Sequence, residues 1–592
     1  MHHDPRAVEE HLTALRRRQD RIRPALLPAR LRYPLGEITL PAHVRHWALH
    51  RPQRPAIVFY GAETSYAELD ELSDRLAGWL AEVGVRPVDR VGVHLPNCSQ
   101  FLVAFLAVLR VGAVHVPVNP LFRSVELRHE LADAAPEVVI TLDTLVPLLE
   151  EVREETPVRE VLVTSLADAL PDEPTLPVPE PGPLPGAGAV GASGTGSPTR
   201  WAEAVSRPRL GRTADDLDAP AALNYTGGTT GMPKGCEHTQ RHMLYTAAAV
   251  CAGSGPAADD GMTVLCHLPV FWIAGENLGV LAPLVSGGTS VLLSRWDASA
   301  VLHGIERYGV STLTGTVENY QELLDHPEFA GRDLTGLTNP TVISFIRKLS
   351  PELRRRWRDV VGENSVLREA SYGMTETHTS DTFTLGFQDA DRDLRTDPVF
   401  CGLPVPGTDI MVVDFRTGEP LPLGERGEIV VRGPSLLTGY WRKPEATAEA
   451  LRDGWLHTGD IGMLDEDGCL HYLGRNKDMI KVSGMSVFPA EVETLLGRHP
   501  DVISAAVVAV ADAERGQLPY AFVRTRPGAA LTGGQLREWA RENMAVYKVP
   551  LVELVEEFPL TATGKIRKVE LAERAEQAGQ AGQTGRRRRR DA

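Results

Sequence analysis

The stretch that decides the fold is YTGGTTGMPKGCEHT, from Tyr225 to Thr239. Residues 226–234 combine three glycines, three threonines and a lysine, directly after the apolar run APAALNY. Glycine lets backbone N–H groups approach an anion closely, and hydroxyl and ammonium groups add donors, so the stretch predicts a polyphosphate-binding loop. It is not a Walker loop, because Pro233 precedes Lys234. The predicted phosphate contacts are Thr226, Gly227, Gly228, Thr229, Thr230, Gly231 and Lys234.

Strand and helix signals alternate around this loop. Strands are predicted at residues 55–60, 89–96, 113–118 and 137–141, and helices at 64–84, 98–112 and 124–134. Thr64 is the expected N-cap of the first helix. The apolar run before the loop and the helical segment QRHMLYTAAAV after it continue the alternation. This pattern predicts an α/β fold with a doubly wound, mainly parallel sheet.

The pattern then changes along the chain. A second α/β stretch covers 215–400, and a β-rich part with regular turn signals covers 400–474. From 475 onward, helix and strand signals predict a compact α+β unit. We therefore expect a large N-terminal domain of doubly wound sheets plus a β-rich subdomain (1–474), a small mobile C-terminal α+β domain (475–575) and a disordered Arg-rich tail (576–592).

A Pro- and Gly-rich stretch, 170–199, is predicted to form a surface insertion. It contains a GxGxxG match at Gly186, Gly188 and Gly191. A dinucleotide site requires a strand before this motif and a helix after it, whereas here prolines precede it and more Gly and Ser follow. The match therefore predicts no dinucleotide site.

Composition and charge exclude several classes of protein. The 592 residues are 43% hydrophobic and 24% charged, as in a folded globular protein. The net charge of −16 disfavours a nucleic-acid surface. The six cysteines include no CxxC pair, so neither a zinc site nor a disulfide framework is predicted, and a reducing cytoplasm is expected. The most apolar stretch, 101–118, is interrupted by Arg110 and His115, which favours a buried helix and strand over a membrane span.

Four further motifs, taken with the loop, resemble those of the adenylate-forming superfamily of acyl-CoA synthetases, peptide-synthetase adenylation domains and luciferases. They are YGMTET (372–377), GWLHTGDIG (454–462), GRNKDMIKVSGMSVFPAEVE (474–493) and PLTATGKIRK (559–568). The resemblance spans about 50 to 570. It implies ATP, Mg²⁺ and a thiol such as that of CoA as reactants or cofactors.

The resemblance also implies roles for individual residues. In the nucleotide motif, which also contains Gly373 and Met374, Tyr372 would stack on adenine, Thr375 would meet the phosphate and Glu376 would hold Mg²⁺. Asp460 and Arg475 would bind the ribose, and Lys565 would be the catalytic lysine. Lys477 occupies the interdomain hinge position, and Lys481 and Gly484 would line the path of the thiol.

The residue types suit this chemistry, since attack of an oxyanion on the α-phosphate brings negative groups together. Catalysis then depends on positioning and on neutralising charge. A lysine, a carboxylate-bound Mg²⁺ and a donor-rich loop provide both.

The sequence departs from the family pattern at the expected acyl pocket. Phe345, Ile346, Arg347 and Lys348 replace a Gly-Gly-Ala-Pro turn. Trp272 stands where a histidine is frequent, and Glu276 and Glu318 lie in the same expected neighbourhood. A tunnel for a long fatty chain should be apolar, because an unpaired buried charge is costly. These residues predict a small polar or aromatic substrate.

Three functions remain open from the sequence. The first is an acid–thiol ligase that forms an acyl adenylate and then a CoA thioester. The second is an ATP-dependent diazotase, which would activate nitrite and transfer nitrogen to an aryl amine such as an aminobenzoate. The third, a non-catalytic ATP-binding relative, is disfavoured by the presence of Glu376, Asp460 and Lys565.

Overall fold

The computed structural model describes residues 5–179, 199–226, 232–258, 260–344, 347–395, 399–483, 485–512, 515–561 and 565–578. Its helices are α1 (Pro5–Ile22), α2 (Leu40–His50), α3 (Tyr66–Glu82), α4 (Ser99–Val111), α5 (Ser124–Ala134), α6 (Val146–Arg153), α7 (Trp201–Ala204), α8 (Gln240–Gly253), α9 (Ile273–Glu276), α10 (Ala282–Ser286), α11 (Ala298–Tyr308), α12 (Val317–Asp325), α13 (Pro351–Val361), α14 (Pro444–Ala450), α15 (Pro489–Leu496) and α16 (Gly533–Asn543). Among the described residues, no helix has the length and apolar character needed to cross a membrane.

The first sheet carries the ends of the predicted phosphate loop. Its order is β7-β6-β5-β3-β4-β8-β9, and its strands are parallel except for the antiparallel pair β8–β9. The strands are β3 (Arg90–His94), β4 (Val114–Pro117), β5 (Val138–Leu142), β6 (Glu160–Thr164), β7 (Thr199–Arg200), β8 (Pro220–Tyr225) and β9 (Gly235–Thr239). The predicted doubly wound α/β class is confirmed.

The second sheet has the order β14-β13-β12-β10-β11-β1-β2. It contains β1 (Pro55–Phe59), β2 (Ala62–Ser65), β10 (Thr263–Cys266), β11 (Thr289–Leu292), β12 (Thr312–Thr316), β13 (Asn339–Ile343) and β14 (Arg368–Glu369). The predicted strand at 55–60 therefore pairs on one side with β2, which follows it directly, and on the other with β11, more than two hundred residues later.

Helix α4 shows why an apolar stretch of this length does not need a membrane. It contacts β1 of the second sheet as well as β3 and β4 of the first, and all its residues after Ser99 are buried. Arg110, which interrupts the stretch, is enclosed and pairs with Asp70 on α3 at 2.6 Å. The N-cap of α3 is Ser65 and not Thr64, because the Ser65 side chain accepts from the Glu68 backbone N–H in a capping box.

Two further sheets follow. The third, antiparallel sheet has the order β15-β16-β21-β20-β18-β17. Its strands are β15 (Thr382–Phe383), β16 (Val399–Pro404), β17 (Asp409–Val413), β18 (Gly427–Arg432), β20 (Trp455–Leu464) and β21 (Leu470–Arg475), with β19 (Leu451–Arg452) beside β20. The fourth contains β22 (Ile480–Val482), β23 (Met485–Val487), β24 (Val502–Asp512), β25 (Gly516–Thr525) and β26 (Leu551–Leu554).

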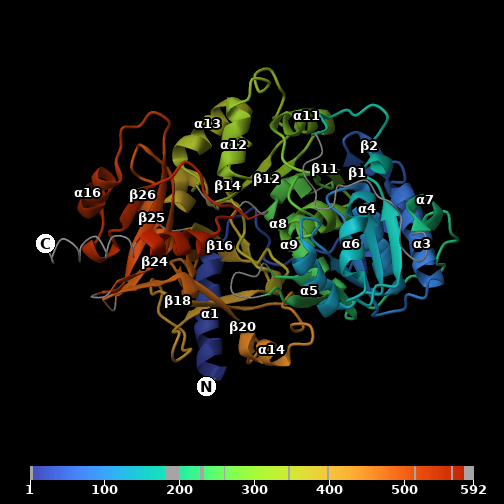
Figure 1. Ribbon diagram of the computed structural model, residues 1–592, viewed down its shortest axis with the longest axis horizontal. Coiled ribbons are helices and arrows are strands. Elements are labelled where there is room, and N and C mark those ends of the chain that lie inside the picture. Colours follow the sequence, from blue (N-terminus) through green and yellow to red (C-terminus); the bar gives the residue numbers. More distant parts are fainter. Residues whose placement is uncertain are drawn as a thin grey trace.

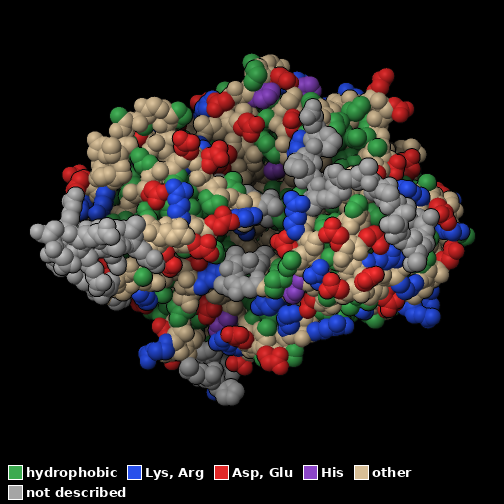
Figure 2. Space-filling view, viewed as in Figure 1, with side chains coloured by type: hydrophobic (Ala, Val, Ile, Leu, Met, Phe, Trp, Pro, Cys, Tyr) green, Lys and Arg blue, Asp and Glu red, His purple; other side chains and the backbone are tan. Residues whose placement is uncertain are grey.

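The sheets are arranged side by side in Figure 1, with the fourth sheet at one end and α3, α4 and α6 at the other. Helix α1, which the sequence did not predict, lies along β18 and β20 (Figure 1). Its Leu12 and Leu15 are buried, and Arg16 pairs with Asp409 of β17 at 2.8 Å. Figure 2 shows a hollow near the centre of the visible face, with basic and acidic side chains around it.

Candidate functional site

The phosphate loop joins the two strands of a β-hairpin. The Thr226 N–H donates to the Lys234 carbonyl (2.9 Å), and the Lys234 N–H donates to Thr226 Oγ1 (3.2 Å). The helix predicted after this stretch is α8, whereas residues 235–239, which the sequence analysis left within the stretch, form β9. Of the other predicted contacts, Gly227, Gly228, Thr229, Thr230 and Gly231 lie outside the described residues.

The aspartate Asp133 of α5 anchors this hairpin to two other parts of the chain. It accepts from the Tyr225 hydroxyl at 2.7 Å and pairs with Lys443 Nζ at 2.7 Å. Its backbone carbonyl accepts from the Trp441 indole at 3.0 Å. Thus one residue joins the start of the loop to the segment before α14.

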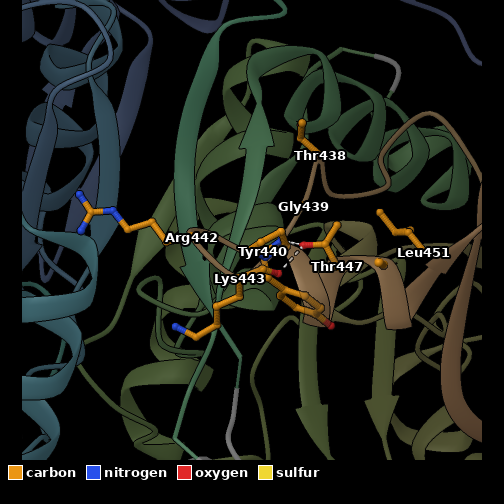
Figure 3. A pocket seen from close by; sticks show the side chains of 9 residues that line it. Thr438, Gly439, Tyr440, Arg442, Lys443, Thr447 and Leu451 are labelled. Atoms are coloured by element: carbon orange, nitrogen blue, oxygen red, sulfur yellow. Dashed lines mark hydrogen bonds between the residues drawn. The ribbon is translucent and has the colours of Figure 1, made fainter.

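That segment borders a groove of about 470 Å³ and is drawn in Figure 3. Arg442 and Lys443 extend to one side, whereas the Tyr440 ring points to the other (Figure 3). Lys234 Nζ lies 3.9 Å from the centroid of the Tyr440 ring, a cation–π distance. The Tyr440 hydroxyl donates to Glu376 Oε1 at 2.9 Å. Burial and the charge of Glu376 raise the pKa of Tyr440, which keeps the hydroxyl a donor.

The structure therefore brings Lys234 and Glu376 to the same tyrosine, although 142 positions separate them in the sequence. A carboxylate beside a phosphate loop is a suitable ligand for Mg²⁺, whose coordination shell phosphate oxygens and water would complete. The residues present fit ATP and Mg²⁺ in this respect.

Tyr372, Asp460 and Arg475 form a second group. The Tyr372 hydroxyl donates to Asp460 Oδ2 at 2.7 Å, and Arg475 Nε lies 2.7 Å from Asp460 Oδ1. Asp460 and Arg475 face each other in the β20–β21 register, which fixes their pairing. Asp460 is 2% exposed, and burial raises its pKa to about 6 against the opposing effect of Arg475.

The nucleotide motif packs tightly against the turn that follows it. A Cβ on Gly373 would lie 2.5 Å from the Ser380 backbone nitrogen, so this position requires glycine. Met374 packs on the core of the third sheet, and Thr375 begins a short 3₁₀ helix with Glu376. The Thr375 carbonyl accepts from His238 Nε2 at 2.8 Å.

Lys565 comes to this site from the C-terminal unit. Burial and the charge of Arg475 lower its pKa, whereas Asp460 opposes that shift. Its ammonium therefore lies in the electric field of the ribose-binding candidates. Lys477 is exposed in a short 3₁₀ helix after β21, and Lys481 lies on β22, where its N–H donates to Gln517 at 2.8 Å. Gly484 lies outside the described residues.

The expected pocket residues have partners inside the protein. Trp272 precedes α9 and packs half-buried on the core. Arg347 donates to Gln321 of α12, and Glu318 of the same helix raises its pKa although burial lowers it overall. Lys348 Nζ donates to the Ser344 carbonyl at 3.3 Å.

Two expected pocket residues are tied to groups that the sequence did not indicate. Lys348 also interacts with the carboxylate of Glu369, although burial lowers the Lys348 pKa overall. Glu276 is fully buried, accepts from Asn224 at 3.0 Å and lies 3.6 Å from His378. Phe345 and Ile346 lie outside the described residues.

Comparisons with known proteins agree with the motifs. The family model described as "AMP-binding enzyme" matches residues 44–441, and the "AMP-binding enzyme C-terminal domain" matches residues 491–565. A long-chain-fatty-acid–CoA ligase of Bacillus subtilis (strain 168) is 32% identical over 547 residues, which cover 91% of this chain and 95% of the ligase. A feruloyl-CoA synthase of Amycolatopsis sp is 34% identical over 536 residues, 89% of this chain and 97% of the synthase.

Among solved structures, ATP-bound MatB from Rhodopseudomonas palustris superimposes with a TM-score of 0.76 at 27% identity. The match covers 90% of this chain and 98% of that one. The similarity therefore includes both the sheets and the C-terminal unit.

Proposed function

Because the chain belongs to the AMP-binding enzyme family within the adenylate-forming superfamily, we propose that it is an acid–thiol ligase. It uses ATP to convert a carboxylic acid to an acyl adenylate and then forms a CoA thioester. The observation that carries the proposal is the position of Lys565, in the field of Asp460 and Arg475. This arrangement supports a role for the cation of the C-terminal unit in the adenylation step.

In the first step a carboxylate oxygen of the substrate attacks the α-phosphorus of ATP, and pyrophosphate leaves with the electrons of the broken P–O bond. Lys565 neutralises charge on the α-phosphate, and Lys234 with the loop N–H groups binds the departing phosphates. Mg²⁺, held by Glu376, would supply further charge neutralisation. Asp460 accepts from the ribose hydroxyls, while Tyr372 positions the adenine.

In the second step the CoA sulfur attacks the acyl carbon, the thiol loses its proton, and AMP leaves. The C-terminal unit (475–575) turns relative to 1–474 about Lys477 to admit the thiol past Lys481 and Gly484. The separate hydrophobic cores of the fourth sheet support such a rigid unit.

The substrate proposed is a small aromatic or polar acid. Charged residues stand where the family has a small-residue turn, and opposite charges interact through space there, Glu318 with Arg347 and Glu369 with Lys348. A long alkyl chain would have to desolvate these groups without compensating hydrogen bonds. The similarity to a feruloyl-CoA synthase also supports an aromatic acid.

The same opposite charges favour one second candidate, the diazotase. In a substrate that carries both an aryl amine and a carboxylate, the carboxylate could interact with Arg347 or Lys348 and the amine with Glu318 or Glu369. Activation of nitrite in place of a carboxylate would then give the same pyrophosphate release with a different product.

One experiment separates these functions: pyrophosphate release by the full chain with Mg-ATP and a panel of aromatic and short acids, with and without CoA, then nitrite with aminobenzoates. The ligase proposal expects acid-dependent release and a CoA-dependent thioester. Release with nitrite but with no acid would replace it by diazotisation. ATP binding with no release would indicate a non-catalytic relative.

Replacing Glu318 by glutamine is expected to change the KM for the acid by about tenfold, since a hydrogen bond to a charged group is lost. The KM for ATP should stay within about twofold. Steady-state kinetics with each substrate varied in turn measure both. Glu322→Gln is the matched control, because Glu322 lies on the same helix and accepts from Trp296 at 2.8 Å on the exposed side. A change confined to the KM for ATP would remove Glu318 from the pocket.

The buried Asp460 predicts a pH dependence of ATP binding. With a pKa of about 6 in the ATP-free protein, Asp460 loses its charge below pH 6. The apparent Kd for ATP should then rise about tenfold for each pH unit below 6, because the ribose hydroxyls need the carboxylate as acceptor. Its neighbour Arg475 keeps its charge in this range, because its pKa is raised further above the usual value.

The same raised pKa has an opposite effect on the stability of the ATP-free protein. The folded state holds this proton more tightly than the unfolded state, so the Asp460 contribution to stability falls as pH rises from about 4 to 6.

Calorimetric titration of ATP between pH 5 and pH 8 measures the pH profile of ATP binding. Asp460→Asn should flatten it, and an unchanged profile in that variant would contradict the assignment.

A further inference from the structure

Directly after the nucleotide motif the backbone makes a left-handed turn of three non-glycine residues. The φ angles are 56° at His378, 61° at Thr379 and 64° at Ser380. Side chains with a Cβ rarely adopt this conformation, and a run of three persists only where the surrounding structure holds it. The turn begins two residues after Glu376, so its shape determines where Glu376 points.

Side chains from α9 and α8 hold this turn. His378 Nδ1 lies 3.0 Å from the Thr246 hydroxyl, and its Nε2 lies 3.6 Å from Glu276 Oε1. His378 and Glu276 are both fully buried. Asn277, the next residue along, donates to the Ser380 hydroxyl at 3.2 Å. Two adjacent residues thus contact both ends of the turn.

Glu276 and Asn277 can do this because the helix changes type between them. Glu276 ends α9, and Asn277 begins a π-helical turn, Asn277–Leu281. A π-helical turn changes the direction of successive side chains and often occurs at functional sites. Here it directs two consecutive polar side chains towards the same loop.

The same network reaches the hairpin that carries the phosphate loop. Asn224 of β8, two residues before Thr226, donates to Glu276 Oε2 at 3.0 Å. From β9, His238 Nε2 donates to the Thr375 carbonyl at 2.8 Å, and its ring packs edge-on against His378 at 4.8 Å. Both strands of the hairpin are therefore tied to the nucleotide motif through buried polar groups.

We propose that Glu276 is a positioning residue: together with His378 and Asn277 it holds the strained turn and so fixes Thr375 and Glu376 relative to the phosphate loop. This deepens the proposed function and rests on it. It differs from the expectation from sequence, in which Glu276 lines the acid pocket. A buried carboxylate that already contacts Asn224 and His378 acts on the nucleotide half of the reaction.

The test compares Glu276→Gln with the wild-type chain. Glutamine keeps the shape and removes the charge, so the hold on His378 weakens. We expect kcat for pyrophosphate release to fall about tenfold and the half-saturating Mg²⁺ concentration to rise several-fold, while the KM for the acid stays within about twofold. A tenfold change in the KM for the acid with unchanged Mg²⁺ dependence would overturn the proposal.

Rescue by glycine separates positioning from a loss of folding. Thr379→Gly adopts the left-handed conformation without strain. In the Glu276→Gln background it should restore at least about a third of the lost kcat, since the turn no longer needs to be held. Thr379→Gly alone is the reference. If Glu276 instead contacts the acid, glycine restores nothing, and the proposal fails.

A second variant covers the case in which Glu276→Gln does not fold. Thr246→Val removes the hydroxyl beside His378 Nδ1 and leaves Glu276 unchanged, and it should shift the Mg²⁺ dependence in the same direction. Calorimetric binding of Mg-ATP in the absence of any acid repeats the test without turnover. If no acid supports pyrophosphate release, the proposed function fails. The positioning role is judged separately: weaker Mg-ATP binding by these variants would still support it. Unchanged Mg-ATP binding would overturn the positioning role.

Discussion

Replacing Lys565 by alanine is expected to reduce adenylate formation by about 100- to 1,000-fold, while ATP affinity stays within about threefold. The structure places this ammonium in the field of Asp460 and Arg475, where burial lowers its pKa. A cation that meets charge developing on the α-phosphate stabilises the transition state more than bound ATP. AMP formation at saturating Mg-ATP and calorimetric ATP binding measure the two quantities.

Lys568→Ala is the matched control for this variant. Lys568 lies three residues further along and pairs with Glu493 at 2.6 Å, so its loss should change AMP formation by less than about threefold. Thioester formation from a synthetic adenylate should also survive in Lys565→Ala, because that step needs no attack on phosphorus. Unchanged AMP production in Lys565→Ala would remove the catalytic assignment.

The elements of the fold were predictable where the signal is local. Helices α4 and α5 and strands β3, β4 and β5 appear at the predicted positions, because the apolar pattern that determines each lies within its own residues. Strand partners were not predictable: β1 pairs with β11, and a pairing across that distance leaves no local mark. β9 was missed because its residues, GCEHT, do not alternate in hydrophobicity.

The candidate site shows the same division. Motifs identified Tyr372, Asp460 and Arg475, and the structure brings their side chains within 2.7 Å. Motifs could not identify the residues that contact the ends of the phosphate loop and Glu376. Asp133 and Tyr440 carry no signal of their own, since each gains its role from partners that only the tertiary fold brings near.

Burial was the second property that the sequence did not reveal. Glu276 and Glu318 stand at similar expected distances from the acid, yet Glu276 is fully enclosed and Glu318 is partly exposed. The sequence reads glutamate at both positions and does not distinguish the two environments. Only the contacts to Asn224 and His378 separate Glu276, which we propose holds the nucleotide motif, from Glu318, which we propose faces the pocket.

Replacing Glu376 by glutamine is expected to reduce kcat/KM for Mg-ATP by about 100-fold or more and to raise the half-saturating Mg²⁺ concentration. Glutamine keeps the length of the side chain and its acceptor for the Tyr440 hydroxyl (2.9 Å), so the fold around it should persist. It lacks the negative charge that offsets desolvation of the metal. Initial rates of AMP formation across a Mg²⁺ titration give both numbers.

Tyr440→Phe distinguishes a role in metal binding from a role in packing. It removes the hydrogen bond to Glu376 but keeps the ring beneath Lys234 Nζ and the carboxylate itself. The loss in kcat/KM should then be only about threefold to tenfold, the effect of one ordinary hydrogen bond. Equal losses in the two variants would mean that Glu376 acts through its contact with Tyr440. A much larger loss in Glu376→Gln, accompanied by the shift in Mg²⁺ dependence, would assign the metal to this carboxylate.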